Sequence, residues 1–267
     1  MKILFLLLTF VSFVIAQQPQ WEHGTGTAVG TDIEAIRMKA LNNARADALA
    51  KASITVTAGD TRLVSESGEE FTDFYSKFAE TSTKGIILEE RIVREGDLKK
   101  VKSTTYEIEI EIEANVALQQ GEPDPSFTVK LESSKQIVKE GEPFILTVTS
   151  TKSGYLTIFN VYQDSLSVVF PNSIDKENKI ETNKPFVFPP HKAYDLQMAL
   201  PARKTTSSEM FIAVVTTENI PFPNIEPLDF AAGTFKLRSE QLNMYAQWLY
   251  KSSLNKRCAD QIPMTVQ

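Results

Sequence analysis

The residues best suited to acid–base or nucleophilic chemistry are few in this sequence. It has two histidines, His23 and His191, and one cysteine, Cys258. A zinc site needs several ligands that converge, and neither histidine belongs to a ligand-spaced cluster. A histidine acting as a general base needs a nucleophile nearby, and the chain contains no G-x-S-x-G motif. We therefore predict no catalytic residue, no metal site and no enzymatic activity.

The glycine-rich run from Gly24 to Gly30 has the composition of a phosphate-binding loop. It lacks the G-K-[ST] ending, and its third glycine falls one place short of the G-x-G-x-x-G/A spacing. The strand that should precede such a loop is also missing. We therefore predict no nucleotide cofactor, and we expect the alternating small and β-branched residues to form a short first strand.

A row of glutamates is the clearest charged pattern. Tyr106–Ala114 alternates apolar residues with acidic ones, and successive side chains of a strand point to opposite faces. The carboxylates would then lie about 7 Å apart on one face. Such a row could bind calcium or a basic partner. We favour a solvated sheet face whose charge discourages aggregation. The row consists of Glu107, Glu109, Glu111 and Glu113.

Residues 1–16 predict a secretory signal peptide. Lys2 gives a positive start, residues 3–15 are almost wholly apolar, and Ala16 fits a cleavage site. The run is too short for a stable membrane anchor, and no later run approaches the length of a spanning helix. We therefore expect an exported protein, periplasmic or associated with the outer membrane of a bacterium, cleaved after Ala16 and without an integral membrane span.

The single cysteine and the net charge narrow the possible class of protein further. A lipoprotein would carry a cysteine directly after the signal peptide, where this chain has Gln17. The lone Cys258 excludes an intramolecular disulfide; it is a buried small residue or a thiol awaiting a partner, and we favour burial. The formal net charge is -6, and neither half carries the basic stripe that nucleic-acid binding requires.

The elements of residues 17–118 predict a small α+β module. Asp32 is a candidate N-cap for a helix over residues 33–52, whose alanines permit close packing on a sheet. A strand is expected at residues 54–58, and strands at 85–93 and 100–116 are joined by a turn. A second amphipathic helix would carry a stripe of inward-facing rings, namely Phe71, Phe74, Tyr75 and Phe78.

Residues 119–126 form a linker rich in proline and polar residues. Residues 127–267 then predict an antiparallel β-sandwich followed by a closing helix at 237–254, with Trp248 on the flank of that helix and a last strand at 262–266. The fold class is therefore α+β. The expected sandwich strands cover residues 127–132, 143–149, 155–162, 166–170, 186–188, 194–200 and 210–217.

Gly154–Asn172 is the most distinctive stretch of the second module. Apolar and β-branched residues lie on both sides of a short polar break, and bulky residues occupy both faces of the first strand. This pattern predicts a central hairpin rather than an edge. Several aromatic residues of this module could line a groove for a peptide or a glycan, although we expect most to fill the core. They are Phe159, Tyr162, Phe170, Phe186, Phe188 and Tyr194.

The pattern Gly154–Asn160 followed by Phe170–Asn172 resembles a bacterial family of envelope domains with no assigned function. Glu140–Glu142 before a strand and the late strand segment Ala213–Thr217 belong to the same pattern, and together the matches span residues 127–220. Domains of this family are appended to diverse exported or signalling proteins. The resemblance therefore implies a binding or assembly module, and it carries no catalytic motif.

The first module resembles the N-terminal module of the flagellar T-ring protein and related outer-membrane lipoproteins. Gly26–Gly30, the alanine-rich Ala35–Ala52, Gly85–Ile87 and the strand ending at Val116 carry this likeness. The chain departs from the lipoproteins because it lacks the lipidated cysteine, so lipid anchoring is not implied.

These observations favour a non-enzymatic envelope protein that acts as an assembly or interaction module of a cell-surface structure. Its partners would be other envelope or surface-machine proteins, bound by surface complementarity or by strand addition at a sheet edge. Two alternatives remain. One is a periplasmic peptide- or glycan-binding protein with a pocket between its domains, and the other is a hydrolase whose site is assembled from distant residues.

Overall fold

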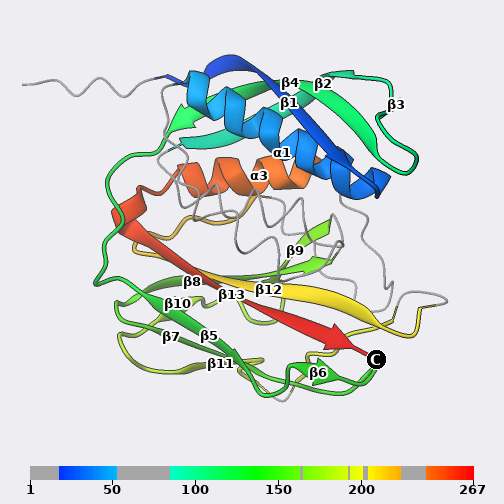
Figure 1. The fold of residues 1–267 in the computed structure, drawn as a ribbon. Helices are drawn as coiled ribbons and strands as arrows, with labels where there is room; N and C mark the ends of the chain where they lie inside the picture. Colours follow the sequence, from blue (N-terminus) through cyan, green and yellow to red (C-terminus); the bar gives the residue numbers. More distant parts are fainter. Residues whose placement is uncertain (1–17, 53–84, 163–164, 192, 201–203, 224–238) are drawn as a thin grey trace, which may run out of the picture.

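The computed structural model describes residues 18–52, 85–162, 165–191, 193–200, 204–223 and 239–267. Figure 1 shows helices and sheets stacked on one another. A sheet covered by one helix lies at the top, a second helix lies beneath it, and two further sheets stack below. The fold class predicted from the sequence, α+β with a C-terminal helix, is confirmed.

The upper layer is a four-stranded antiparallel sheet in the order β1–β4–β2, with β3 beside β4. Helix α1 (Ile33–Lys51) follows β1 directly and covers one face. Its N-cap is Asp32, as predicted, whose carboxylate accepts a hydrogen bond from the Ala35 N–H at 2.9 Å. The strands are β1 (Gln20–Gly30), β2 (Gly85–Glu95), β3 (Lys99–Lys100) and β4 (Tyr106–Leu118).

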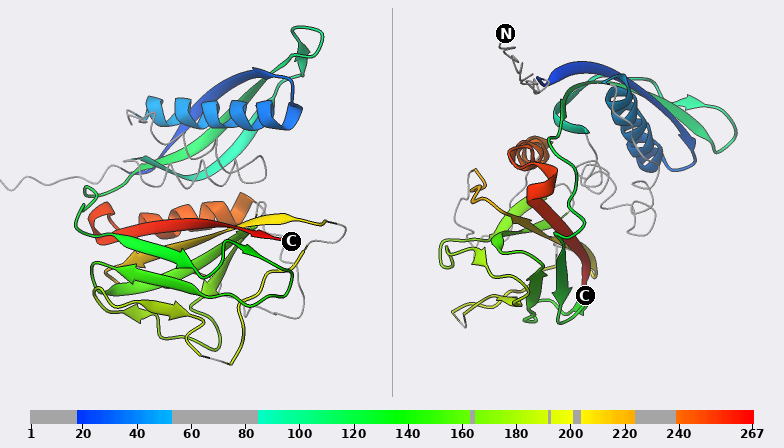
Figure 2. Two further views of the ribbon diagram at one scale, coloured as in Figure 1. Left: turned by 60° about the horizontal axis from the view of Figure 1, so that its bottom comes forward. Right: turned by 90° about the vertical axis from the view of Figure 1, so that its left-hand side faces the viewer.

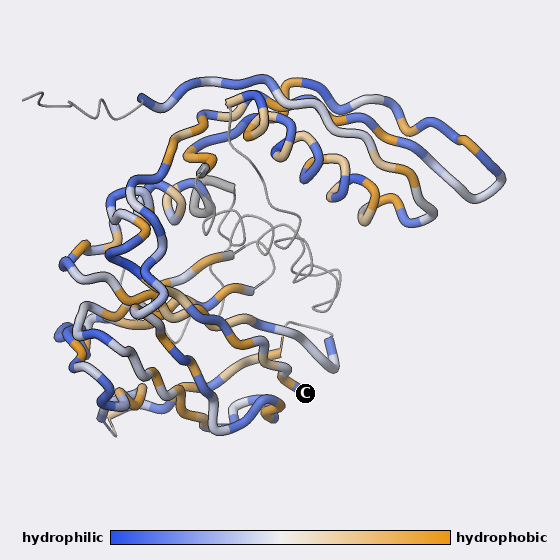
Figure 3. The backbone as a smooth tube through the Cα atoms, turned by 60° about the vertical axis from the view of Figure 1, so that its left-hand side comes forward, coloured by the Kyte–Doolittle hydropathy of each residue, from blue (hydrophilic) through white to orange (hydrophobic). Residues whose placement is uncertain are grey.

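Helix α1 packs against β1 at very short range. Ala40, Ala44 and Ala48 of the helix are fully buried, and they face Gly24 and Gly26 of the strand. A Cβ atom at Gly26 would lie 2.0 Å from the Ala40 carbonyl oxygen. The tube in Figure 3 alternates along α1 between hydrophilic blue and the pale tan of such small apolar residues. The glycine-rich run is thus a strand whose missing side chains admit the helix backbone.

The second domain contains two sheets packed face to face. A six-stranded sheet has the order β10–β8–β12–β13–β6, with β9 also paired to β8, and a three-stranded sheet has the order β11–β7–β5. Their bounds are β5 (Val129–Ser133), β6 (Ile137–Val138), β7 (Leu146–Ser150), β8 (Gly154–Tyr162), β9 (Ser165–Phe170), β10 (Lys179–Ile180), β11 (Phe186–Phe188), β12 (Ser207–Thr216) and β13 (Arg257–Val266).

Strand β8 is central, as its sequence predicts. Its neighbours are β12 on one side and β9 and β10 on the other. Leu156 and Ile158 face the three-stranded sheet, whereas Phe159 and Val161 face the opposite way, and all four are fully buried. The six-stranded sheet is therefore covered on both faces.

Helix α3 (Ser239–Tyr250) supplies the second cover and joins the two domains. It lies between the six-stranded sheet and the upper sheet in both views of Figure 2. Its Trp248 packs in one apolar cluster with Phe159 of β8 and with Ile86 and Leu88 of β2. Because the helix is contacted from two sides, Trp248 is only 2% exposed, whereas the sequence placed it on a flank. The short helix η3 (Leu254–Lys256) then leads into β13.

Other expectations are corrected in detail. Residues 194–200 form no strand; within them Leu196 makes a single bridge to Phe144. The strand expected at 100–116 is divided into β3 and β4, and the final strand begins earlier, at Arg257. The strand expected at 54–58 and the aromatic helix expected at 71–78 lie outside the described residues.

Candidate functional site

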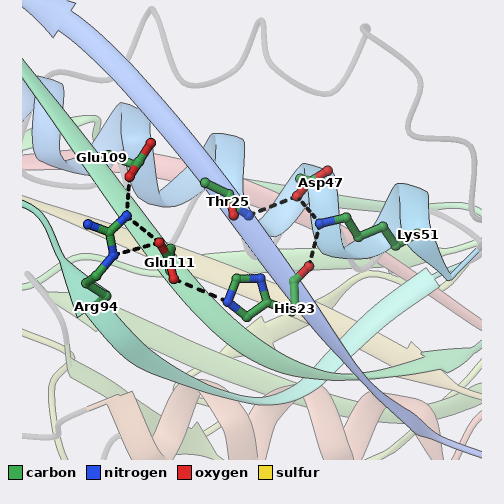
Figure 4. Close-up of polar contacts among 7 residues, drawn as sticks. All are labelled: His23, Thr25, Asp47, Lys51, Arg94, Glu109 and Glu111. Carbon is green, nitrogen blue, oxygen red and sulfur yellow. Dashed lines mark hydrogen bonds and ion pairs between the residues drawn. The ribbon is translucent and has the colours of Figure 1, made fainter.

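The glutamate row of β4 occupies the face of the upper sheet that α1 does not cover. Arg94 of β2 bridges Glu109 and Glu111, and its Nε lies 2.6 Å from the Glu111 carboxylate (Figure 4). The Arg91 Nε donates to Glu113 at 2.6 Å. The hydrogen bond from Arg94 lowers the pKa of Glu111 below its usual value.

This charged face is thus a ladder of ion pairs. Lys99 lies opposite Glu107 in the strand register, and His23 of β1 approaches Glu111 with its Nε2 at 3.4 Å. Within the described part of the chain, no three His, Cys, Asp or Glu side chains are grouped to hold a metal ion. The positive partners favour the solvated face over the calcium-binding alternative, because Arg91 and Arg94 already pair with three of the four carboxylates.

The outer edge of β1 is covered by polar side chains of α1. These side chains, of Asn43, Asp47 and Lys51, are spaced four residues apart, so they lie on one face of the helix and reach alternate residues of the strand. Burial raises the pKa of Asp47, but hydrogen bonds from Lys51 and Thr25 outweigh it, so the net shift is downward. The bonds join Asn43 Nδ2 to Thr27 O (2.8 Å), Thr25 N to Asp47 Oδ2 (2.9 Å) and Lys51 Nζ to His23 O (2.8 Å), the last two drawn in Figure 4.

The opposite edge of this sheet, β2, is irregular. Its register with β4 shifts between Ile87 and Glu89 and again between Ile92 and Arg94. The carbonyl oxygen of Leu88, at the first irregularity, accepts a hydrogen bond from Gln247 of α3 at 3.3 Å. Bulges and covering side chains are devices that prevent strand addition at an edge. They oppose the strand-addition mode of binding for the upper sheet.

The second domain contains an open cavity of about 500 Å³ beside His191. Phe144 and Leu196 form its buried floor, and Ile145, which is 43% exposed, lies at its rim. Three prolines add rigid walls. They are Pro143, Pro189 and Pro190.

A buried polar network supports this cavity from one side. The Tyr194 hydroxyl donates to Asp175 Oδ2 at 2.6 Å and accepts from Asn172 Nδ2 at 2.9 Å. His191 Nε2 lies 3.3 Å from the other oxygen of Asp175, whose side chain is only 4% exposed. Burial and the bond to Asp175 raise the pKa of Tyr194, so its hydroxyl stays protonated as a donor.

Asn172 positions this network through the local backbone. Its Oδ1 accepts hydrogen bonds from the N–H groups of Ile174 (2.9 Å) and Asp175 (2.8 Å). Such an Asx turn fixes the direction of Asp175. Sequence reasoning noted the Phe170–Asn172 pattern and Tyr194 but missed Asp175. The spacing Asn-x-x-Asp after a proline was the available signal.

The three side chains best suited to acid–base or nucleophilic chemistry lie in different parts of the fold. The side chain of His191 is 69% exposed, and its polar contact within the described residues is the Asp175 carboxylate, not a serine or cysteine. His23 lies on β1 of the other domain, so the fold does not bring the two histidines together. Cys258 of β13 is partly buried, and burial raises the pKa of its thiol to about 12. A protonated thiol is a poor nucleophile.

The described residues form an α+β fold whose β-sandwich contains an open cavity. Residues 137–219, which include most of this sandwich, match a domain of unknown function (DUF4384). The match supports the resemblance of the second module to a family of unknown function, and it does not extend to the first module. No curated protein matches the chain. No helix in the described ranges has the length and apolar character to span a membrane.

Proposed function

We propose that this protein is a non-enzymatic, exported interaction module of the bacterial cell envelope, and that it engages a partner protein through the cavity beside His191. The observation that supports this proposal is the cavity, which has a volume of about 500 Å³ and is lined mainly by apolar and aromatic side chains with few polar groups. Concave apolar sites with a few fixed polar groups are where proteins bind ligands.

The edges and the charged face of the upper sheet support this choice. The edge of β1 is covered by α1, the edge of β2 is irregular, and the glutamate row is paired with arginines. The upper sheet therefore offers few unsatisfied groups to a partner. The exposed Ile145 and the proline walls around it present an apolar surface instead.

Export and assembly complete the proposal. Residues 1–16 have the pattern of a signal peptide, and the likeness of residues 17–118 to the flagellar T-ring module favours a place in a cell-surface structure, flagellar or associated with the outer membrane. Both features rest on the sequence.

A second candidate function is the binding of a free peptide or glycan in the periplasm. The cavity volume falls within the range of roughly 300–1,000 Å³ that is usual for small-molecule sites. The cavity lies within the second domain, between residues 134 and 196, rather than between the domains as the sequence hypothesis placed it.

The test is capture from a bacterial envelope fraction with residues 17–267, tagged at residue 17 because the C-terminal Gln267 is bonded to Val138 and Glu140. Captured proteins are identified by mass spectrometry. The Ile145→Lys variant should lose the partner. The matched control Ile92→Lys, at a residue 42% exposed in the other domain, should retain it. Equal capture by both variants, or loss with Ile92→Lys alone, would overturn the proposal.

A further inference from the structure

We infer that the cavity beside His191 receives a lysine or arginine side chain of the partner protein, with the aliphatic stem in the cavity and the cationic head at Asp195. This inference rests on the proposed function, because it names what the same site binds. It follows from three properties of the lining: its apolar floor, its occupied backbone groups and its charge.

The floor and walls of the cavity suit an apolar group of the partner. Phe144 is 3% exposed and Leu196 is 7% exposed, and both line the cavity. The Tyr194 hydroxyl is turned away into the bonds with Asp175 and Asn172, and its ring also lines the cavity. Filling such a surface removes apolar area from water, at roughly 25 cal/mol per Å².

The N–H groups of Ser134, Phe144 and Ile145 on one side of the cavity are already hydrogen-bonded, so this side does not offer a site for a partner strand. The Phe144 N–H donates to Leu196 O at 3.1 Å, and the Ser134 N–H donates to Ile145 O at 2.9 Å. The Ile145 N–H donates to Ser134 Oγ at 3.0 Å. The prolines of the wall have no N–H group at all. These occupied groups favour recognition through a side chain of the partner.

The charge of the lining favours a cation. Asp195 is exposed at the cavity and forms no ion pair or hydrogen bond with the residues that the structure describes. The lining residues that the structure describes include no lysine or arginine. Lys135 approaches the Pro143 carbonyl oxygen at 3.2 Å, but its ammonium group is paired with Glu142 at 2.7 Å.

A lysine or arginine side chain combines the two requirements. Its methylene stem packs on apolar surface while its charged head stays near water. In this cavity the stem would contact Phe144 and Leu196, and the head would meet the carboxylate of Asp195 at the exposed side. A neutral apolar side chain would fill the same floor but would leave Asp195 without a partner.

The test uses two acetylated five-residue peptide amides, with lysine or norleucine between alanines, and the protein of residues 17–267. Norleucine keeps the stem and removes the charge. Amide NMR shifts at Tyr194 and Leu196 report binding in the cavity. We expect the lysine peptide to bind about threefold more tightly at low salt, since exposed charge pairs contribute modestly. Asp195→Asn should abolish the difference, and Asp97→Asn, the same charge change in the other domain, should preserve it.

The outcomes separate this inference from the proposed function. Equal or tighter binding of the norleucine peptide would overturn the cationic ligand while leaving the cavity as a binding site. Absence of shifts at Tyr194 and Leu196 with both peptides would overturn the inference altogether. In that case envelope capture with Ile145→Lys and Ile92→Lys still decides the proposed function, because it does not depend on the ligand chosen.

Discussion

Helices α1 and α3 both cover an antiparallel sheet, but they do so with opposite packing. Helix α1 places fully buried alanines against the glycines of β1, so the two backbones nearly touch. Helix α3 places Tyr245 and Trp248 around Phe159 of β8, with ring centroids 5.1 Å and 5.4 Å away. The first interface depends on the absence of side chains, and the second depends on large rings.

The difference extends from packing to surface. In the first domain the short approach lets Asn43, Asp47 and Lys51 reach the edge of β1, and the charges of the free face are paired. In the second domain the sandwich leaves an open apolar cavity beside His191. The edge of β1 and the charged face of the first domain therefore make polar contacts within the domain, whereas the second domain contains the open cavity at which we propose that the partner binds.

The largest effect is expected at the ring interface. Phe159→Ala should lower the free energy of unfolding by about 4 kcal/mol, because it deletes a fully buried ring that contacts Tyr245 and Trp248. Phe159→Leu, which keeps most of the apolar volume, should cost less than half as much. Urea denaturation followed by tryptophan fluorescence measures both. An equal loss for the two variants would show that ring packing is not what holds α3.

A single methyl group added at Gly26 should disrupt the close contact between α1 and β1. Gly26→Ala places a Cβ atom 2.0 Å from Ala40 O and 2.3 Å from Ala44 N, both backbone atoms that cannot move alone. We expect a loss of about 3 kcal/mol in stability. The neighbouring Thr27→Ala, whose side chain is exposed, should change the stability by less than about 0.5 kcal/mol. A tolerated Gly26→Ala would contradict the account of α1.

A partly buried carboxyl group of the second domain, that of Glu209, should make stability depend on pH. Burial raises the pKa of Glu209 from 4.5 to about 7, and the bond from Asn160 opposes this only in part. Between these values the folded state holds the proton more tightly than the unfolded chain, so stability falls as the pH rises through this window.

Glu209→Gln removes the titration and keeps an acceptor for Asn160. We expect this variant to be more stable than the native protein by roughly 2 kcal/mol at pH 8 and nearly equal to it below pH 5, as denaturation at both pH values would show. Glu177→Gln, at an exposed position, is the control and should leave the profile unchanged. A native profile that rises from pH 5 to pH 8, unchanged by Glu209→Gln, would refute this assignment.

The smallest effect is expected on the charged face. Arg94→Gln removes the bridge between Glu109 and Glu111, and because these groups are exposed the loss should be slight. The loss should also vanish in about 1 M salt, where the screening length is about 3 Å. Thermal unfolding at low and high salt measures it. Loss of partner capture by this variant would instead make the glutamate face the binding surface.

Most helices and strands could be predicted from the sequence because the residue patterns that indicate them are local. The alternation from Tyr106 to Ala114 predicts which side of β4 is buried, and the apolar residues on both faces of β8 predict its central place. The prediction of a strand at residues 194–200 was wrong, because the alternation of apolar and polar residues there belongs to a loop that lies over the core. Within the described residues of this loop, only Leu196 makes a β-bridge. Burial alone can imitate a strand pattern there.

The cavity could not be predicted because its residues are distant in the sequence. Ser134, Phe144 and Tyr194 come from three connections of the sandwich, and only the pairing of β5, β7 and β11 brings these connections together. The same holds for the partner of His191. Two strands, β10 and β11, separate Asp175 from His191 in the sequence, and the turn at Asn172 directs Asp175 inward.

The central claim is that the protein meets its partner at the cavity and not at the first domain. Benzoylphenylalanine in place of Ile145, introduced in living cells and irradiated, tests this contact directly, with the same substitution of Ile92 as the reference. The account predicts a covalent adduct of one defined size from position 145 and none from position 92. Adducts from position 92 alone, or from neither position when the partner is captured by the native protein, would contradict it.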